Sequence, residues 1–170
     1  MGTDVSRAQV DPADVALATR LGGLELSFVT AHQGLLDRGA LGSVESNLVT
    51  TFANHHLAHA SAFQTLLRTL DRTAPPLASD PDLDAELALL AAAASGRPAL
   101  LALAHHIERI AAASATLAVE RAVDEHTIRL VAEVAPVEAQ HLFLLDTVLD
   151  RPIGERLADF ESTDAHRLGD

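Results

Sequence analysis

The sequence predicts an all-α protein, a bundle of four long helices with a shorter helix in the connection between the second and the third. Hydrophobic residues make up 48% of the 170 residues, and most of them are Ala and Leu, which favour helices. Aromatic residues make up only 3%, and few segments are rich enough in β-branched and aromatic residues to form strands. In four long segments the apolar residues recur at the spacing of one helix face. The length fits a single domain.

The first predicted helix begins at Pro12 and runs to about Arg38. Asp11 can cap its first turn, Pro12 suits the first helical position, and Gly39 is a natural stop. Its expected core-facing positions are Val15, Ala18, Leu21, Glu25, Phe28, His32 and Leu35.

The second predicted helix follows a short loop, residues 39–43, and ends near Arg72. A loop this short makes the first two helices antiparallel neighbours. The core-facing positions expected here are Leu48, Phe52, His56, His59, Phe63, Leu66 and Leu70.

The segment "TAPPLASDPD", residues 73–82, interrupts the helical pattern. Asp80 and Pro81 then start a shorter helix, which is expected to bury Leu83, Leu87 and Leu90 and to end at Ser95-Gly96. The whole connection, about 25 residues, is long enough to run back along the bundle. The second and third long helices can therefore lie parallel.

The third long helix is expected from Pro98 to about Val123, and the fourth from about Asp124 to Leu149, where Arg151-Pro152 stops it. Pro136 removes one backbone hydrogen bond from the fourth helix and predicts a kink or a π-type bulge there. The core-facing positions are Leu101, Ala104, Glu108, Ala111, Ala115 and Val119 on the third helix, and Val131, Val134, Glu138, His141, Leu145 and Leu149 on the fourth.

Residues 12–150 thus form the predicted bundle, residues 1–11 an N-terminal extension and residues 151–170 a charged C-terminal tail, in which Leu157 and Phe160 can dock on the bundle. The formal charge of −12 argues against nucleic acid and anionic membrane surfaces as partners. The absence of Cys excludes disulfides, thiolate metal sites and cysteine nucleophiles. No signal segment or membrane span is evident, so we expect a cytoplasmic protein or one whose export leader has been removed.

Acids and histidines interrupt each of the four apolar faces at a regular spacing. Glu25 precedes His56 and His59 by 31 and 34 residues. Glu108 precedes Glu138 and His141 by 30 and 33 residues. The chain therefore contains the same pattern twice, one acid on a helix and then a pair of potential ligands three residues apart on the next helix.

Residues three apart lie on one face of a helix, so Glu138 and His141 can direct a carboxylate and an imidazole to the same metal ion. Burying three carboxylates without compensating cations would cost more than the net stability of a small domain. Metal binding removes this difficulty because the charges become ligands. The sequence therefore predicts a metal site formed by Glu25, His56, His59, Glu108, Glu138 and His141.

These residues resemble those of the ferritin-like superfamily, in the small actinobacterial-type, desiccation-related branch. The resemblance rests on Glu25, the segments "HLAH" (56–59) and "IE" (107–108), and "APVEAQHLFLL" (135–145). It implies a ferritin-like four-helix bundle, a dinuclear iron or manganese centre, and oxidase, ferroxidase or peroxide-related activity. A homo-oligomer, with a dimer favoured, is also expected.

His56 departs from the family pattern, which has a bridging Glu at this position. Imidazole suits zinc, copper, nickel and Fe(II), whereas carboxylate suits manganese and iron. The site could therefore hold two ions, or a single zinc or copper ion in a non-catalytic or stress-associated protein. A third alternative is a structural bundle in which the polar groups bond to one another and to water. The lack of Tyr rules out a tyrosyl radical, and no haem-attachment or nucleotide-binding motif is present.

Several further polar residues could orient the ligands. His55 is the natural substitute for His56 if the helix is rotated by one position. The other candidates for this supporting role are His32, His105, His106 and Gln140.

Overall fold

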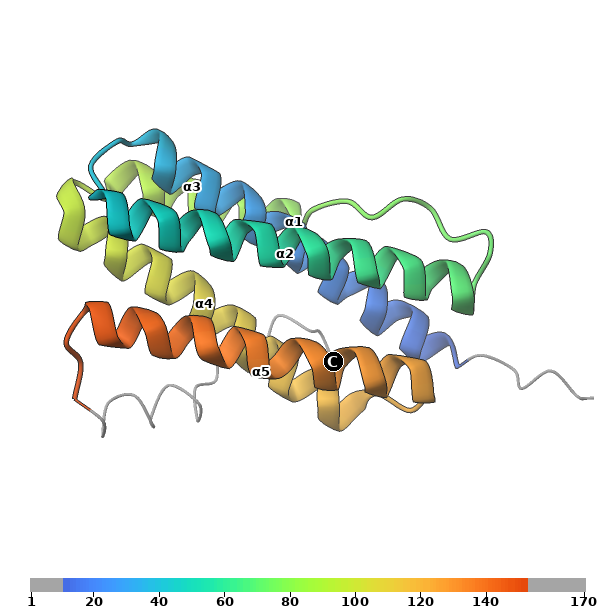
Figure 1. Ribbon diagram of the computed structural model, residues 1–170. Coiled ribbons are helices and arrows are strands. Elements are labelled where there is room, and N and C mark those ends of the chain that lie inside the picture. Colours follow the sequence, from blue (N-terminus) through green and yellow to red (C-terminus); the bar gives the residue numbers. More distant parts are fainter. Residues whose placement is uncertain (1–10, 153–170) are drawn as a thin grey trace, which may run out of the picture.

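The computed structural model describes residues 11–152, and these form an all-helical bundle (Figure 1). No strand occurs within this range. The all-α prediction is therefore confirmed. The helices are α1 (Pro12–Asp37), α2 (Ser43–Leu70), α3 (Pro81–Ala93), α4 (Gly96–Arg121) and α5 (Glu125–Val148).

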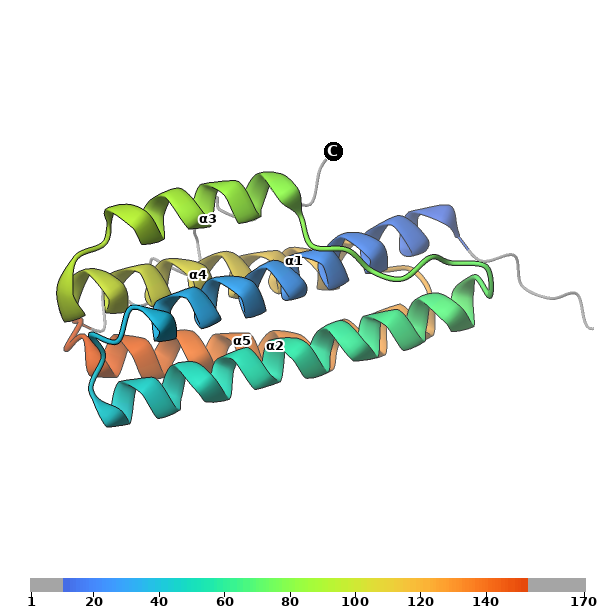
Figure 2. The same ribbon diagram turned by 90° about the horizontal axis from the view of Figure 1, so that it is seen from above.

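The connection between α2 and α4 runs the length of the bundle (Figures 1 and 2). Short loops make α1 antiparallel to α2 and α4 antiparallel to α5. Residues 71–80 and α3 then return the chain to the end where α2 began, so that α2 and α4 run parallel. In the view from above, α3 lies along one edge of the bundle, beside α4 and α1 (Figure 2), and it contacts both helices. This is the single-crossover arrangement that the length of the connection predicts.

Aspartates begin three of the helices, and local sequence explains each start. The Asp11 carboxylate accepts a hydrogen bond from the Ala13 N–H at 2.9 Å, Asp80 accepts two at 3.0 Å at the start of α3, and Asp124 caps α5. Such side chains satisfy backbone donors that the first helical turn leaves unpaired. Gly39 follows α1 with a φ of +64°, a conformation that favours glycine.

The crossover is anchored closely to α1. A Cβ added at Gly23 would lie 2.9 Å from the Ala78 carbonyl oxygen, so the backbones approach more closely than a side chain allows. One turn further, the buried Ser27 hydroxyl accepts a hydrogen bond from the Asp80 N–H at 2.9 Å. These contacts place α3 along α1 and so fix the topology at mid-bundle.

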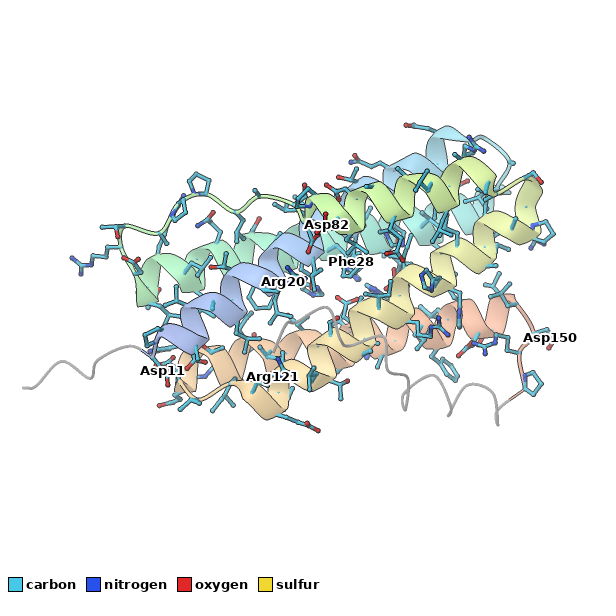
Figure 3. The ribbon with its side chains drawn as sticks, turned by 180° about the vertical axis from the view of Figure 1, so that it is seen from behind. Asp11, Arg20, Phe28, Asp82, Arg121 and Asp150 are labelled. Carbon is cyan, nitrogen blue, oxygen red and sulfur yellow. The ribbon has the colours of Figure 1, made fainter. Side chains whose placement is uncertain are left out.

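The core consists of two hydrophobic clusters at opposite ends of the bundle. One gathers Phe28 with residues near the C-terminus of α1, the start of α2 and α4 and the end of α5, and it also takes Leu83 and Leu87 from α3. The other gathers Phe63 with residues from the opposite ends of the four long helices. Seen from behind, Phe28 lies at mid-length, with Asp11 and Arg121 at one end of the bundle and Asp150 at the other (Figure 3).

Two residues predicted to be buried are exposed instead. Leu90 is 40% exposed because, within residues 11–152, α3 is covered only on the side where Leu83 and Leu87 face α1 and α4. Val119 is 41% exposed, and Ala118 takes the inward position near the end of α4.

The predicted helix limits differ by one or two residues from those observed. α4 begins at Gly96, which places Pro98 within its first turn, and it ends at Arg121. α5 continues as an α-helix through Pro136, with no π turn at that point. Leu157 and Phe160 of the expected tail lie outside the described residues, as do residues 1–10.

Candidate metal centre

Ionisable side chains from all four long helices meet between the two hydrophobic clusters. α1 contributes Glu25, α2 contributes two histidines, α4 contributes Glu108, and α5 contributes Glu138 and a histidine. Glu108 and Glu138 are fully buried. The structure therefore brings together all six residues that the sequence singles out: Glu25, His56, His59, Glu108, Glu138 and His141.

One half of this cluster lies on the side of Glu25. The Nδ1 atom of His56 is 2.7 Å from Glu25 Oε2, and the Nδ1 atom of His59 is 2.7 Å from Glu138 Oε1. The diagonal distances are longer, 3.5 Å from His59 Nδ1 to Glu25 Oε2 and 3.6 Å from His56 Nδ1 to Glu138 Oε1. One atom from each of these four residues lies within 4.8 Å of the others.

The other half lies on the side of Glu108. Its Oε1 atom is 3.2 Å from His56 Nε2, and its Oε2 atom is 3.1 Å from His141 Nδ1. The same His141 nitrogen is 3.3 Å from Glu138 Oε2. His56, Glu108, Glu138 and His141 thus form a second group of four within the same distance limit, and His56 and Glu138 belong to both groups.

The carboxylates change the protonation of the histidines. Burial lowers the pKa of His56, but the charges of Glu138, Glu108 and Glu25 outweigh it and raise this pKa well above its usual value. For His59, burial is likewise outweighed by the carboxylates of Glu138 and Glu25 beside it, which raise its pKa to about 9.

The partner groups shift in the complementary direction. Burial raises the pKa of the Glu108 carboxyl, but the nearby His56, His141 and His32 bring it well below the usual range. For Glu138, burial likewise raises the pKa, and the nearby histidines outweigh it and lower the pKa. For His141, burial lowers the pKa, and the carboxylates of Glu108 and Glu138 outweigh it and raise the pKa. In the metal-free protein, protonated imidazoles therefore occupy the place of the cations that the carboxylates require.

These residues fit a metal centre in one further respect. Neither carboxylate oxygen of the buried Glu138 has a hydrogen bond of good geometry, and the same holds for His59 Nδ1. Buried polar atoms without such a partner are rare in folded proteins. A metal ion would satisfy all three atoms, and the mixture of carboxylate and imidazole donors suits iron, manganese or zinc.

A sequence model of the family described as ferritin-like domain matches residues 2–151. The chain belongs to the ferritin-like domain family. Comparisons with curated proteins and with solved structures gave no match. None of the helices within residues 11–152 combines the length and apolar character needed to cross a membrane.

Two of the expected supporting residues lie against this ferritin-like centre. His32 is fully buried, and its Nε2 atom is 2.9 Å from Glu108 Oε1, while its Nδ1–H donates to the Phe28 carbonyl oxygen at 2.8 Å. His55 is exposed, and its Nδ1 atom is 2.8 Å from His141 Nε2. The two residues approach the centre from opposite sides, one from the interior and one from the surface.

The other expected supporting residues have different surroundings. His105 Nε2 is 2.9 Å from Asp146 Oδ1, and Arg151 contacts both of these residues. His106 lies beside Arg109, and Gln140 is exposed.

Two phenylalanine rings that the helical spacing predicts to be buried pack against histidines of the cluster. The Phe52 ring stacks on His141 with a centroid distance of 4.2 Å, and Phe28 packs against His56 at 5.2 Å. Each phenylalanine lies near a cluster histidine on a predicted core face, so helical spacing gave the signal. Such packing restricts how the two imidazole rings can turn.

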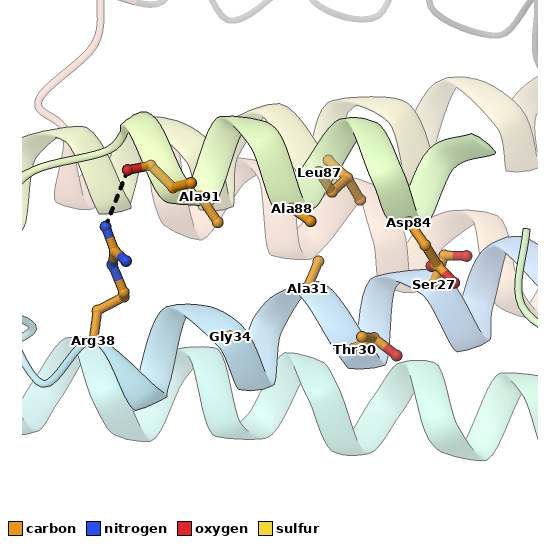
Figure 4. A pocket seen from close by; sticks show the side chains of 10 residues that line it. Ser27, Thr30, Ala31, Gly34, Arg38, Asp84, Leu87, Ala88 and Ala91 are labelled. Carbon is orange, nitrogen blue, oxygen red and sulfur yellow. Dashed lines mark hydrogen bonds between the residues drawn. The ribbon is translucent and has the colours of Figure 1, made fainter. Parts of the chain in front are cut away.

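A separate groove lies between α1 and α3 (Figure 4). Its volume is about 310 Å³, and small residues such as Ala31, Gly34 and Ala88 line it. At one end Arg38 donates hydrogen bonds to the carbonyl oxygens of Ala92 and Ala94, at 3.4 and 3.0 Å. Arg38 therefore ties α1 to the C-terminal end of α3.

Proposed function

We propose that this ferritin-like protein binds two metal ions, iron or manganese, at the cluster between the two hydrophobic halves of its core. The observation that carries the proposal is the pair of overlapping four-residue groups, both of which include the buried Glu138. Among the described residues, the ion-pair partners of the three carboxylates in these groups are imidazoles. Such a set of charges suits metal cations better than it suits protons.

In this proposal Glu25 and His59 would hold one ion, Glu108 and His141 would hold the other, and Glu138 would serve both. An iron or manganese pair would supply one-electron chemistry toward oxygen or peroxide. The protein's own contribution is to exclude water and to fix the ligands. The phenylalanines restrict the imidazole rings, and His32 holds one oxygen of Glu108. An oxidase, ferroxidase or peroxide-consuming activity follows from this chemistry.

A second candidate function is non-catalytic binding of a single zinc or copper ion. His56 supports it, because an imidazole replaces a carboxylate and lowers the negative charge available to two Fe(III) ions. Three imidazoles in one cluster favour these later metals.

Metal analysis of protein stripped with a chelator and reloaded separately with Fe(II), Mn(II) and Zn(II) tests these candidates. Two equivalents of iron with rapid oxygen consumption would support the first proposal. One tightly held zinc ion, with no reaction toward oxygen or peroxide, would support the second, and no retained metal would leave a structural bundle.

The variant His56→Glu makes this test sharper, since it completes the carboxylate pattern of the family. We expect it to raise iron occupancy relative to the wild type. The exposed His126→Ala is the matched control, because it removes a histidine outside the cluster. Unchanged iron binding in His56→Glu would count against His56 as a ligand.

A further inference from the structure

His56 lies between the two four-residue groups and directs a different ring nitrogen to each. Its Nδ1 atom is 2.7 Å from Glu25 Oε2, on the side that also contains His59. Its Nε2 atom is 3.2 Å from Glu108 Oε1, on the side that also contains His141. The two nitrogens lie on different edges of a rigid ring, so a single ion cannot bind both of them.

The His56 ring is held in this orientation from several directions. It is 0% exposed, and the rings of Phe28 and His32 pack against it with centroid distances of 5.2 and 5.3 Å. The rings of His59 and His141 stand nearly perpendicular to it, at 84° and 79°. Neighbours this close restrict rotation of the ring, and the carboxylates on both sides give each nitrogen a partner.

Glu138 also contacts both groups, through a different carboxylate oxygen for each. Its Oε1 atom faces His59 and its Oε2 atom faces His141. Each group therefore contains two nitrogens and two oxygens: a glutamate and a histidine of its own, one oxygen of Glu138 and one nitrogen of His56. Because the donor types set the metal preference, the two groups should favour the same divalent ions.

We propose that His56 bridges the two metal ions as an imidazolate, with Nδ1 bound to the ion beside Glu25 and Nε2 bound to the ion beside Glu108. This inference rests on the proposed two-metal function and adds the bridge that joins the two sites. Both ring nitrogens must be free of protons, so every N–H of His56 is replaced by a metal–nitrogen bond and its protons are released to solvent. No oxidant or reductant is required.

The bridge gives His56 a role that His59 and His141 do not share. Each of these terminal histidines belongs to one group only, so its removal should weaken one metal site. Removal of His56 should weaken both sites and break the electronic connection between them. An imidazolate transmits magnetic coupling between paramagnetic ions, and Cu(II) is therefore the probe of choice.

The experiment loads chelator-stripped protein with Cu(II), removes loosely bound copper, and counts copper by elemental analysis and unpaired spins by EPR. We expect the wild type and His126→Ala to hold two coppers per chain with only a small fraction of the spins visible. His59→Ala should hold one copper whose full spin is visible. His56→Ala should lose the coupling, so that every copper it retains is visible, with circular dichroism checking that the helices remain.

The possible results separate the two proposals. Failure of the wild type to hold metal would overturn both the metal-binding function and the bridge. Two coppers with full spin in the wild type would overturn the bridge and leave the two-metal site standing. Coupling that persists in a dicopper His56→Ala protein would assign it to Glu138 and would also overturn the inference. If His56→Ala fails to fold, His59→Ala still tests the inference, because two coupled coppers in that variant would contradict the assignment of His59 to one of the two sites.

Discussion

Metal binding at the cluster should release protons, so the apparent affinity should rise with pH above neutrality. His59 has a pKa of about 9 in the metal-free protein, because the carboxylates of Glu138 and Glu25 beside it outweigh the effect of burial. A metal must displace this proton before it can bind Nδ1. At pH 7 the competing proton lowers the apparent binding constant about 100-fold, and by pH 9 the penalty has almost disappeared. The raised pKa values of His56 and His141 steepen this dependence.

The metal-free protein should show the opposite trend in stability. A histidine whose pKa is higher in the folded state stabilises that state below its unfolded pKa of 6.5, and the contribution is lost as pH rises to about 9. The stabilisation from His59 amounts to about 1–3 kcal/mol, a value reduced because partial exposure of the ring allows solvent to screen its charge. The lowered pKa values of Glu108 and Glu138 add stability above 4.5 that is lost as pH falls. The metal-free protein should therefore be most stable between about pH 4.5 and 6.5.

Titration calorimetry with Zn(II), a redox-inert probe, measures both the affinity and the protons released when it is repeated in buffers of different ionisation enthalpy. Urea unfolding of chelator-treated protein measures the stability trend. The His126→Ala variant serves as the control for histidines outside the cluster. Equal affinity at pH 7 and pH 9, or a metal-free protein that becomes more stable over that range, would refute the reasoning.

Three further predictions concern the scaffold. Gly34→Ala should stabilise the fold by about 0.5–1 kcal/mol, because a Cβ there meets no atom within 4 Å. Gly23→Ala should destabilise the fold, because its Cβ would meet the Ala78 carbonyl oxygen at 2.9 Å. Urea unfolding that gives both changes the same sign would contradict this prediction. Asp14→Ala should lower the free energy of unfolding by about 1–3 kcal/mol, since the buried carboxylate accepts two backbone hydrogen bonds from the α4–α5 loop. A thermal unfolding midpoint equal to that of the wild type would argue against this prediction. Phe52→Leu should lower the free energy of unfolding by less than about 1.5 kcal/mol but weaken metal binding about tenfold, because it removes the ring that stacks on His141. Unchanged zinc affinity would show that this stacking does not orient the imidazole.

Local sequence predicted the parts of the fold that depend on neighbouring residues. Asp11 and Asp80 act as helix caps because their carboxylates reach amides only two or three positions away. The six cluster residues were found because their spacing places them on the inward faces of four helices. These signals required no knowledge of how the helices pack.

The remaining features depend on packing between distant segments. Asp14 binds amides about 110 positions later in the chain, at Val123 and Asp124, and no local pattern indicates this contact. The inward position near the end of α4 belongs to Ala118 and not to Val119, because the packing of α4 in the bundle sets which residue turns inward. For the same reason the atom that each residue directs to the cluster was not predictable, although the meeting of the six residues was.

The energetics of the cluster distinguish a binding site from a structural element. A buried ionic network is often no more stable than well-packed apolar residues of the same volume, while removing one partner costs about 3–5 kcal/mol. In the metal-free protein Glu138 lacks hydrogen bonds of good geometry at both oxygens, so the network is incompletely satisfied. Metal present at about 100 times its Kd would add about 2.7 kcal/mol. If the cluster served stability alone, replacing it by apolar residues would raise the free energy of unfolding. If the cluster binds metal, the metal raises the free energy of unfolding, and removing any one of the glutamates abolishes this increase. Unfolding of Glu138→Gln with and without Zn(II) therefore separates the two roles: a metal-binding cluster predicts that the variant loses the stabilisation by zinc, and a structural cluster predicts that zinc stabilises neither protein.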